Sequence, residues 1–144
     1  ERQYCAPGVD LPVATIMRSK YGEFPEYHTS LDNLELVTES GLIGGYIAIR
    51  KSIEILENNC ILKTTVLCEP QLGKRGMYPI LSMTDVPFQV VSMMNLISFC
   101  DGNNSLLEIA DLIEESFEEI YPIATKLIDT GIIEVINEKH SNDI

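Results

Sequence analysis

The hydrophobic residues of this chain recur with a helical period in its middle third. From Leu42 to Leu56 the apolar side chains are spaced three and four residues apart, which places them on one face of a helix. Thr38 is in position to cap the start of this helix, and the pair Asn58–Asn59 favours its end. A second apolar run, from Val86 to Cys100, predicts another helix.

Two shorter helices carry their own start signals. Ser105 precedes a helical pattern that ends at Ile113, and Ser116 precedes one that ends at Asp129; each serine is followed three residues later by a glutamate, which is the capping-box pattern. The run Ile132–Ile136 that follows predicts a strand. Three short helices followed by a strand predict a winged helix-turn-helix.

Turn-forming residues and short apolar runs organise the remaining segments. Leu11–Met17 reads as a short buried strand, and a loop from Arg18 to Asn33 follows it. Ile61–Leu67 predicts a strand or an extended connector, and Asp101–Asn104 predicts a turn. Three glycines near the start of the first helix lower its propensity and suggest close packing against a sheet; they are Gly41, Gly44 and Gly45.

A domain boundary is predicted near residue 68. The segment from Cys68 to Pro79 has few core-forming residues and contains two glycines. We therefore expect one domain within residues 1–67 and a winged helix-turn-helix domain within residues 68–144.

The charge of the chain restricts its partners. The net charge is −12, whereas binding to nucleic-acid phosphates or to anionic membranes needs clustered Lys and Arg. Residues 68–144 hold thirteen acidic and four basic residues, a difference of −9. Glu118 and Glu119 stand at the start of the helix that would enter a DNA groove, where base contacts are normally made. We expect neither DNA nor a membrane as partner.

The four cysteines and the apolar runs bear on location. None of the cysteines forms a CxxC pair, so a cysteine zinc site is not expected, and wide spacing is typical of reduced thiols in the cytoplasm. No run approaches the ~18 apolar residues of a membrane span, and no signal peptide is visible. The chain opens at Glu1 without a methionine, which fits a trimmed chain, a proteolytic product or part of a longer protein.

The segment Gly22–Asn33 holds the main chemical candidate, His28. The only other histidine, His140, lies in a polar tail. A histidine that follows an aromatic residue and precedes Thr-x-x-Asp suits a metal ligand whose second ring nitrogen is held by a neighbour. The alternative is an ordinary loop histidine bonded to a backbone carbonyl. A catalytic zinc needs about three protein ligands, so His28 alone does not make a site.

Other reactive residues have competing interpretations. Cys5 could act as a nucleophile with His28 as base, or be a buried thiol. Asp32 could bind metal, or fix the loop and cap the turn that follows. Lys74–Arg75, between glycines, could bind phosphate or form a solvated linker that pairs with local acids.

Three early stretches and one later one carry a resemblance to a known family. They are Glu1–Gly8, Leu11–Val13, Tyr21–Leu34 and Cys68–Gly76. The early stretches resemble the C-terminal part of zinc aminopeptidase-like proteins, which in bacteria are often described as polysaccharide-biosynthesis proteins with an aminopeptidase-like domain. The later one resembles the segment that joins the catalytic domain of this family to an appended winged helix.

The resemblance implies a fold, an activity and a ligand. Residues 1–67 become the C-terminal fragment of an α/β domain that hydrolyses peptide or amide bonds with metal-activated water. His28, in the aromatic-His-Thr-x-x-Asp stretch, becomes the last metal ligand. The other ligands and the catalytic glutamate lie upstream in such families, so no catalytic residue is assigned in this chain. Glu1 stands where the wider group has the histidine of a Ser-Asp-His turn.

Arg2 and Tyr4 are the substrate-binding candidates. They could donate to a carbonyl oxyanion or to a substrate carboxylate, or serve only turn packing and a surface ion pair.

We therefore expect the C-terminal portion of a zinc-dependent aminopeptidase-like hydrolase. The isolated chain is expected to bind zinc weakly or not at all and to be inactive. Its expected partners are the remainder of the aminopeptidase-like domain and a further protein or a second copy. The alternative is a non-enzymatic module whose acidic winged helix binds another protein.

Overall fold

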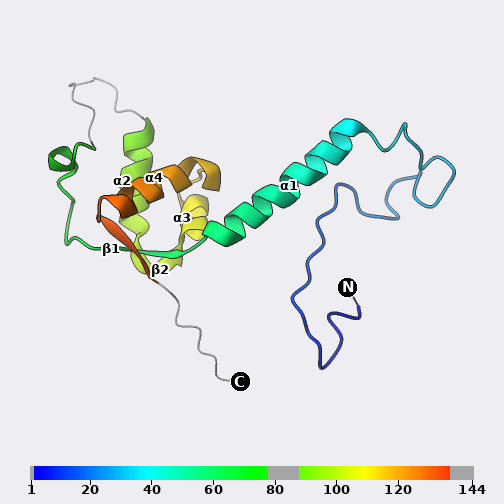
Figure 1. Cartoon of the computed structure of the whole chain (residues 1–144), viewed down its shortest axis with the longest axis horizontal. Helices are drawn as coiled ribbons and strands as arrows, with labels where there is room; N and C mark the ends of the chain where they lie inside the picture. The colour runs from blue at the N-terminus through cyan, green and yellow to red at the C-terminus, as the bar shows by residue number, and fades with distance from the viewer. Residues whose placement is uncertain (1, 78–87, 137–144) are drawn as a thin grey trace. The chain divides into compact units, whose positions relative to one another are not determined.

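The computed structural model describes residues 2–77 and 88–136 (Figure 1). It divides into two compact units, Glu1–Leu56 and Glu57–Ile144. The division precedes the boundary at 67/68 that the sequence predicted, because strand β1 (Ile61–Thr64) pairs with two strands that come later in the chain. A segment whose hydrogen bonds all lie in one sheet belongs to the domain of that sheet.

The first unit contains one helix and a series of turns. Helix α1 (Glu39–Asn58) begins where the sequence predicted, since the Thr38 hydroxyl oxygen accepts a hydrogen bond from the Gly41 amide at 3.1 Å. The predicted buried strand at Leu11–Met17 is wrong, because these residues are exposed and form no strand. No other strand lies between residues 2 and 58 to complete its hydrogen-bond ladder.

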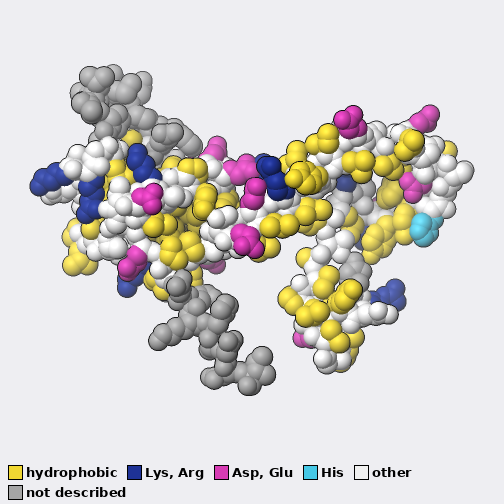
Figure 2. All heavy atoms as spheres, viewed as in Figure 1, with side chains coloured by type: hydrophobic (Ala, Val, Ile, Leu, Met, Phe, Trp, Pro, Cys, Tyr) yellow, Lys and Arg dark blue, Asp and Glu magenta, His cyan; other side chains and the backbone are white. Residues whose placement is uncertain are grey.

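The first unit has no buried core of its own. No side chain between residues 2 and 61 is buried. Apolar side chains instead cover the surface along α1 (Figure 2). The exposed stripe of α1 follows spacings of 4, 3, 4 and 3 residues, and Leu56 at its end is 77% exposed; its members are Leu42, Tyr46, Ile49, Ile53 and Leu56. A helix with such a stripe is stabilised mainly by packing, and the described residues offer this stripe no partner.

The second unit is built around a three-stranded antiparallel sheet. The strand order is β2 (Asp101–Ser105), β1, β3 (Ile133–Ile136), so β1 is central. The predicted turn at Asp101–Asn104 is wrong, because these residues form most of β2. The turn-forming Gly102 has φ +92° and lies in an irregularity of the β1–β2 register. A glycine in this conformation is typical of a bulge within a strand.

Three helices pack with the sheet: α2 (Phe88–Phe99), α3 (Leu106–Leu112) and α4 (Phe117–Asp129). The start that the sequence predicted for α2, Val86, lies outside the described residues. Both predicted capping boxes are present, at Ser105 with Glu108 and at Ser116 with Glu119. A short 3-10 helix, η1 (Leu72–Arg75), follows the first strand.

The helices and the sheet of the second unit enclose a core. Its largest fully buried apolar side chains are Leu62, Leu72, Leu96, Leu106, Ile109, Ile120, Leu127, Ile132 and Ile133. In α4 the buried residues are Phe117, Ile120, Ala124 and Leu127, while Glu118 and Glu119 are exposed. The unit thus has three helices and an antiparallel sheet, and a short turn joins α3 to α4. This arrangement confirms the predicted winged helix-turn-helix. Within the described ranges, no helix combines the length and the apolar character that crossing a bilayer requires.

Candidate metal-binding loop

His28 lies in a tight turn that the Thr29 side chain closes. The carbonyl oxygen of Glu26 accepts hydrogen bonds from the Thr29 amide at 3.1 Å and from the Thr29 hydroxyl at 2.8 Å. The same hydroxyl oxygen accepts from the Leu31 amide at 3.2 Å. The Thr-x-x-Asp part of the motif thus has a local structural role, because Thr29 locks the turn on both sides of His28.

The backbone of His28 is in the left-handed region, with φ +56°. Turns with a positive φ at their third position normally carry Gly or Asn there. For other L-residues this conformation costs roughly 1–2 kcal/mol. The His28 side chain is also exposed. Asp10, Cys68 and Glu114 also have a positive φ, so it is the combination with the exposed imidazole and the aromatic-His-Thr motif that favours a functional role for His28.

An aromatic cluster supports the His28 ring. The rings of Tyr27 and His28 are stacked, with centroids 4.1 Å apart and planes inclined by 14°. Phe24 meets the Tyr27 ring edge-on at 5.7 Å, and Tyr21 lies at 6.0 Å from it. Tyr27 is therefore the centre of the cluster, and it is half-buried whereas His28 is exposed.

The described residues do not assemble a complete metal site. No three His, Cys, Asp or Glu side chains lie close enough together in residues 2–77 and 88–136 to hold an ion. The exposed imidazole of His28 has the nitrogen donor that zinc uses. Among the described residues, His28 has the chemistry to contribute one ligand to a zinc ion. His140 and Glu1 lie outside the described residues.

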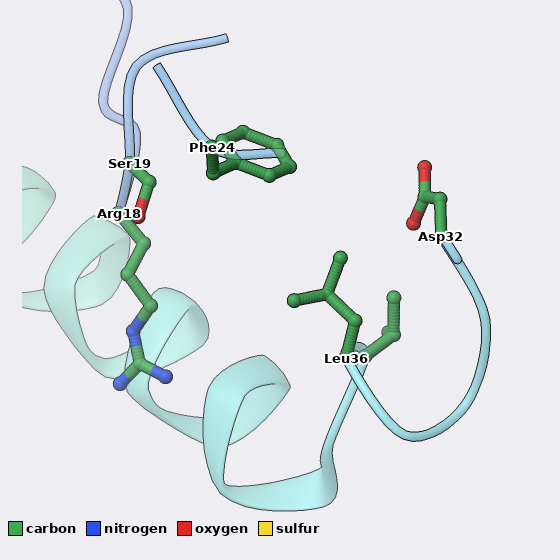
Figure 3. A pocket seen from close by; sticks show the side chains of 6 residues that line it. Arg18, Ser19, Phe24, Asp32 and Leu36 are labelled. Carbon is green, nitrogen blue, oxygen red and sulfur yellow. The ribbon is translucent and has the colours of Figure 1, made fainter. Parts of the chain in front are cut away.

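A cavity of about 320 Å³ lies beside this loop in the first unit (Figure 3). Figure 3 shows Arg18 and Asp32 at opposite sides, with Phe24 and Leu36 between them. The side chain that caps the turn after the loop belongs to Asn33, whose Oδ1 accepts from the Glu35 amide at 2.8 Å. Asp32 thus lines the cavity, and Asn33 caps the turn instead.

The Arg18 guanidinium approaches two of the glycines in α1. A Cβ added at Gly44 would come within 2.7 Å of Arg18 Nη2, and one added at Gly41 within 3.3 Å of Nη1. Gly41 and Gly44 therefore lie against the end of the flexible Arg18 side chain and not against a sheet, and a Cβ added at Gly45 would meet nothing within 4 Å. The sequence offered one signal for this, the spacing of three between the two glycines, which places both on one helix face. Nothing in the sequence selects Arg18 as the side chain that fills the space.

The substrate-binding candidates Arg2 and Tyr4 are both exposed and neither lines this cavity. The Tyr4 carbonyl accepts from the Leu11 amide at 2.8 Å and closes a turn. The Cys5 thiol is exposed and donates to the Leu11 carbonyl at 3.5 Å. A Cys5–His28 nucleophile pair therefore has no support, because the thiol is engaged elsewhere.

Polar groups of the second unit have structural roles. Arg75 Nη1 donates to the Thr130 carbonyl at 2.7 Å, at the C-terminal cap of α4, which favours the linker interpretation of Lys74–Arg75. Burial, followed by the nearby Asp101 and Cys60, raises the pKa of the Cys100 thiol to about 12. Burial also raises the pKa of Cys60. Both thiols are therefore protonated and unreactive near neutral pH.

Comparison with known proteins places both units. A family described as winged helix-turn-helix matches residues 59–135, and a family described as a domain of unknown function matches residues 1–59. The chain therefore belongs to the winged helix-turn-helix family. The junction of the two matches lies close to the division between the structural units.

Two relatives from Clostridium acetobutylicum extend the comparison. The chain is 40% identical over 138 residues to a protein named as a polysaccharide biosynthesis protein with an aminopeptidase-like domain, covering 94% of this chain and 32% of that protein. A crystal structure described as that of a peptidase matches with a TM-score of 0.78 and 35% identity, over 94% of this chain and 29% of that one.

The relatives confirm the resemblance to aminopeptidase-like proteins with an appended winged helix. They also confirm the predicted fold class, an α/β-domain fragment followed by a winged helix-turn-helix. The chain spans only about a third of the length of each relative.

Proposed function

We propose that this chain is the C-terminal portion of a zinc-dependent aminopeptidase-like hydrolase and contributes His28 as one metal ligand. The observation that carries the proposal is the conformation of His28, an exposed imidazole held at φ +56° on a hydrogen-bonded turn. Bound zinc would supply activated water for the hydrolysis of an amide bond. The chain itself holds and orients one ligand, and the remaining ligands lie outside the described residues.

The remainder of the aminopeptidase-like domain covers the apolar stripe of α1 in this proposal. Residues 2–56 bury no side chain, so they lack the packed core that an independent unit needs. Each relative has about two thirds of its length outside the region that this chain matches. Burial of an exposed Leu or Ile is worth about 1.5–3 kcal/mol, so the four Leu and Ile positions of the stripe give a strong drive to dock.

The winged helix-turn-helix contacts protein and not DNA in this account. The start of α4 presents Glu118 and Glu119, and the only base in that helix, Lys126, is in its last turn. Carboxylates in this position would repel phosphates. The partner is the rest of the same protein, a second copy or another protein.

Arg2 and Tyr4 remain proposed substrate-binding residues, as donors to a substrate carboxylate or oxyanion. Their exposure is compatible with that role. A cytoplasmic location is part of the same proposal, and it is supported by four free cysteines in the described residues.

Hydrolysis of an amino-acyl anilide tests the proposal. The full-length protein is expected to cleave it, to lose activity with a zinc chelator and to regain it when zinc is added back. The isolated 144-residue chain is expected to show no turnover, with or without zinc. Steady turnover by the isolated chain that is lost on chelation would overturn the assignment of a single ligand to it. A full-length protein that contains no zinc would support the alternative, a non-enzymatic interaction module.

A further inference from the structure

Tyr27 is the residue on which the geometry around His28 depends most. Its ring makes three aromatic contacts, to Tyr21, Phe24 and His28. Phe24 packs edge-on against Tyr27, and Tyr27 in turn faces the imidazole at 4.1 Å. The burial of the side chains agrees with this arrangement, since Phe24 and Tyr27 are half-buried while His28 is exposed.

The stacked Tyr27 ring restricts the rotation of the His28 imidazole plane, which the turn leaves free. The hydrogen bonds of Thr29 fix the backbone of the turn, but they do not set the plane of the imidazole. Rotation of a ring about its terminal side-chain torsion is otherwise broad. The nearly parallel Tyr27 ring, inclined by 14°, narrows the accessible planes. A ligand whose orientation is fixed in advance loses less entropy when it binds a metal.

We propose that Tyr27 is a positioning residue that sets the plane of the His28 imidazole for metal binding. This inference rests on the proposed function of His28 as a zinc ligand. The role belongs to the aromatic face, because the recorded contact is a ring stack. The tyrosine hydroxyl is not needed for it.

Zinc affinity of the full-length protein, measured by competition with a chromogenic chelator, tests the role without reference to activity. Tyr27→Leu removes the ring face and is expected to weaken zinc binding about 10-fold, the lower end of the cost of losing an outer-shell hydrogen-bond partner of a metal-bound histidine. Tyr27→Phe keeps the face and is expected to retain wild-type affinity. Tyr21→Leu, which removes a neighbour that does not stack on His28, is the matched control and is expected to stay close to wild type.

The outcomes separate the two claims. If zinc affinity is unchanged in Tyr27→Leu while His28→Ala loses the metal, the role of Tyr27 is refuted and His28 stands. If Tyr27→Phe is as weak as Tyr27→Leu, the hydroxyl matters and the role of the ring is refuted. If His28→Ala keeps full zinc content, the proposed function fails first. Should Tyr27→Leu not fold, Tyr27→Met replaces it, because a flexible thioether fills the space without providing a ring plane.

Discussion

Tyr121 Oη donates a hydrogen bond of 2.7 Å to Oδ1 of Asn58. This bond ties α4, the second helix of the helix-turn-helix, to the last residue of α1. The next residue has a similar role, since Asn59 Oδ1 accepts from the Leu107 amide at 2.9 Å, at the start of α3. The two asparagines that the sequence marked as a helix end therefore also attach that end to both helices of the helix-turn-helix.

Removal of the tyrosine hydroxyl is expected to weaken this attachment. Tyr121→Phe keeps the stack on Phe117, whose ring centroid lies 5.7 Å away, and deletes only the hydrogen bond. We expect a loss of about 0.5–1.5 kcal/mol in the free energy of unfolding of the 144-residue chain, measured by urea denaturation. An unchanged midpoint and slope would show that the bond contributes nothing.

The helix caps of the second unit predict a dependence of stability on pH. Hydrogen bonds from the Ser105 backbone and side chain hold the pKa of Glu108 below its ordinary 4.5. Those from the Ser116 side chain and backbone do the same for the pKa of Glu119. A carboxyl with a lower pKa in the folded state contributes stability above pH 4.5 and loses it as the pH falls through the folded pKa.

Ser116→Ala tests this coupling. The loss of the cap is expected to cost about 0.5–2 kcal/mol near neutral pH. It should cost less at pH 3 than at pH 6, because protonated Glu119 no longer benefits from the serine. Ser98→Ala is the control, since its hydroxyl bonds only the Met94 carbonyl within α2. An equal cost of Ser116→Ala at both pH values would contradict the assigned cause.

The register of the central strand β1 predicts that charge reversal at two exposed lysines will destabilise the fold by different amounts. Lys63 lies directly opposite Glu134 in β3 and opposite Asp101 in β2. Opposite charges in such positions each contribute roughly 0.2–1 kcal/mol, and like charges destabilise. Lys63→Glu is therefore expected to destabilise the fold by about 1 kcal/mol or more. Lys74→Glu in η1 changes the net charge by the same amount and is expected to destabilise the fold less. Equal decreases of the Tm in the two variants would show that the charges opposite Lys63 contribute nothing to stability.

Hydrophobic periods and capping residues predicted the helices well, because both are properties of neighbouring residues. The predictions of a strand and a turn that depended on strand pairing were wrong. The period of α4 and its cap are properties of neighbouring residues, so Ser116, Glu119 and the buried face could be read from the sequence. A strand exists only if a partner supplies its hydrogen bonds. The sequence therefore suggested a strand at Leu11–Met17, where no partner is described, and a turn at Asp101–Asn104, where β1 provides one.

The candidate site was predictable to the same extent. The motif around His28 identifies the residue, because the order aromatic-His-Thr is local. The 4.1 Å stack is a detail of ring orientation that a linear motif does not contain. Arg18 is separated from Gly44 by more than twenty residues of turns, and no periodic pattern connects them. Arg18, Phe24 and Leu36 could therefore be found only once the loop had a structure.

The charge of the second unit predicts that it does not bind duplex DNA. Ordinary DNA-binding domains bind non-specifically with a Kd of roughly 10⁻⁴–10⁻⁶ M at physiological salt. Residues 57–144 contain the whole described core, so this piece is expected to fold alone and can be titrated with fluorescent duplex DNA. No binding in that range is expected. Micromolar binding that weakens as salt is raised would overturn the protein-contact role.

The zinc content of the purified full-length protein, measured by elemental analysis, tests the central claim most directly. His28→Ala removes the proposed ligand from an exposed turn, so the fold should persist while the bound zinc is lost. His140→Ala, which changes the only other histidine in this chain, is the matched control and should keep the wild-type zinc content. Loss of zinc in His28→Ala alone is the result that this account predicts. A His28→Ala protein that binds as much zinc as the wild type would contradict it.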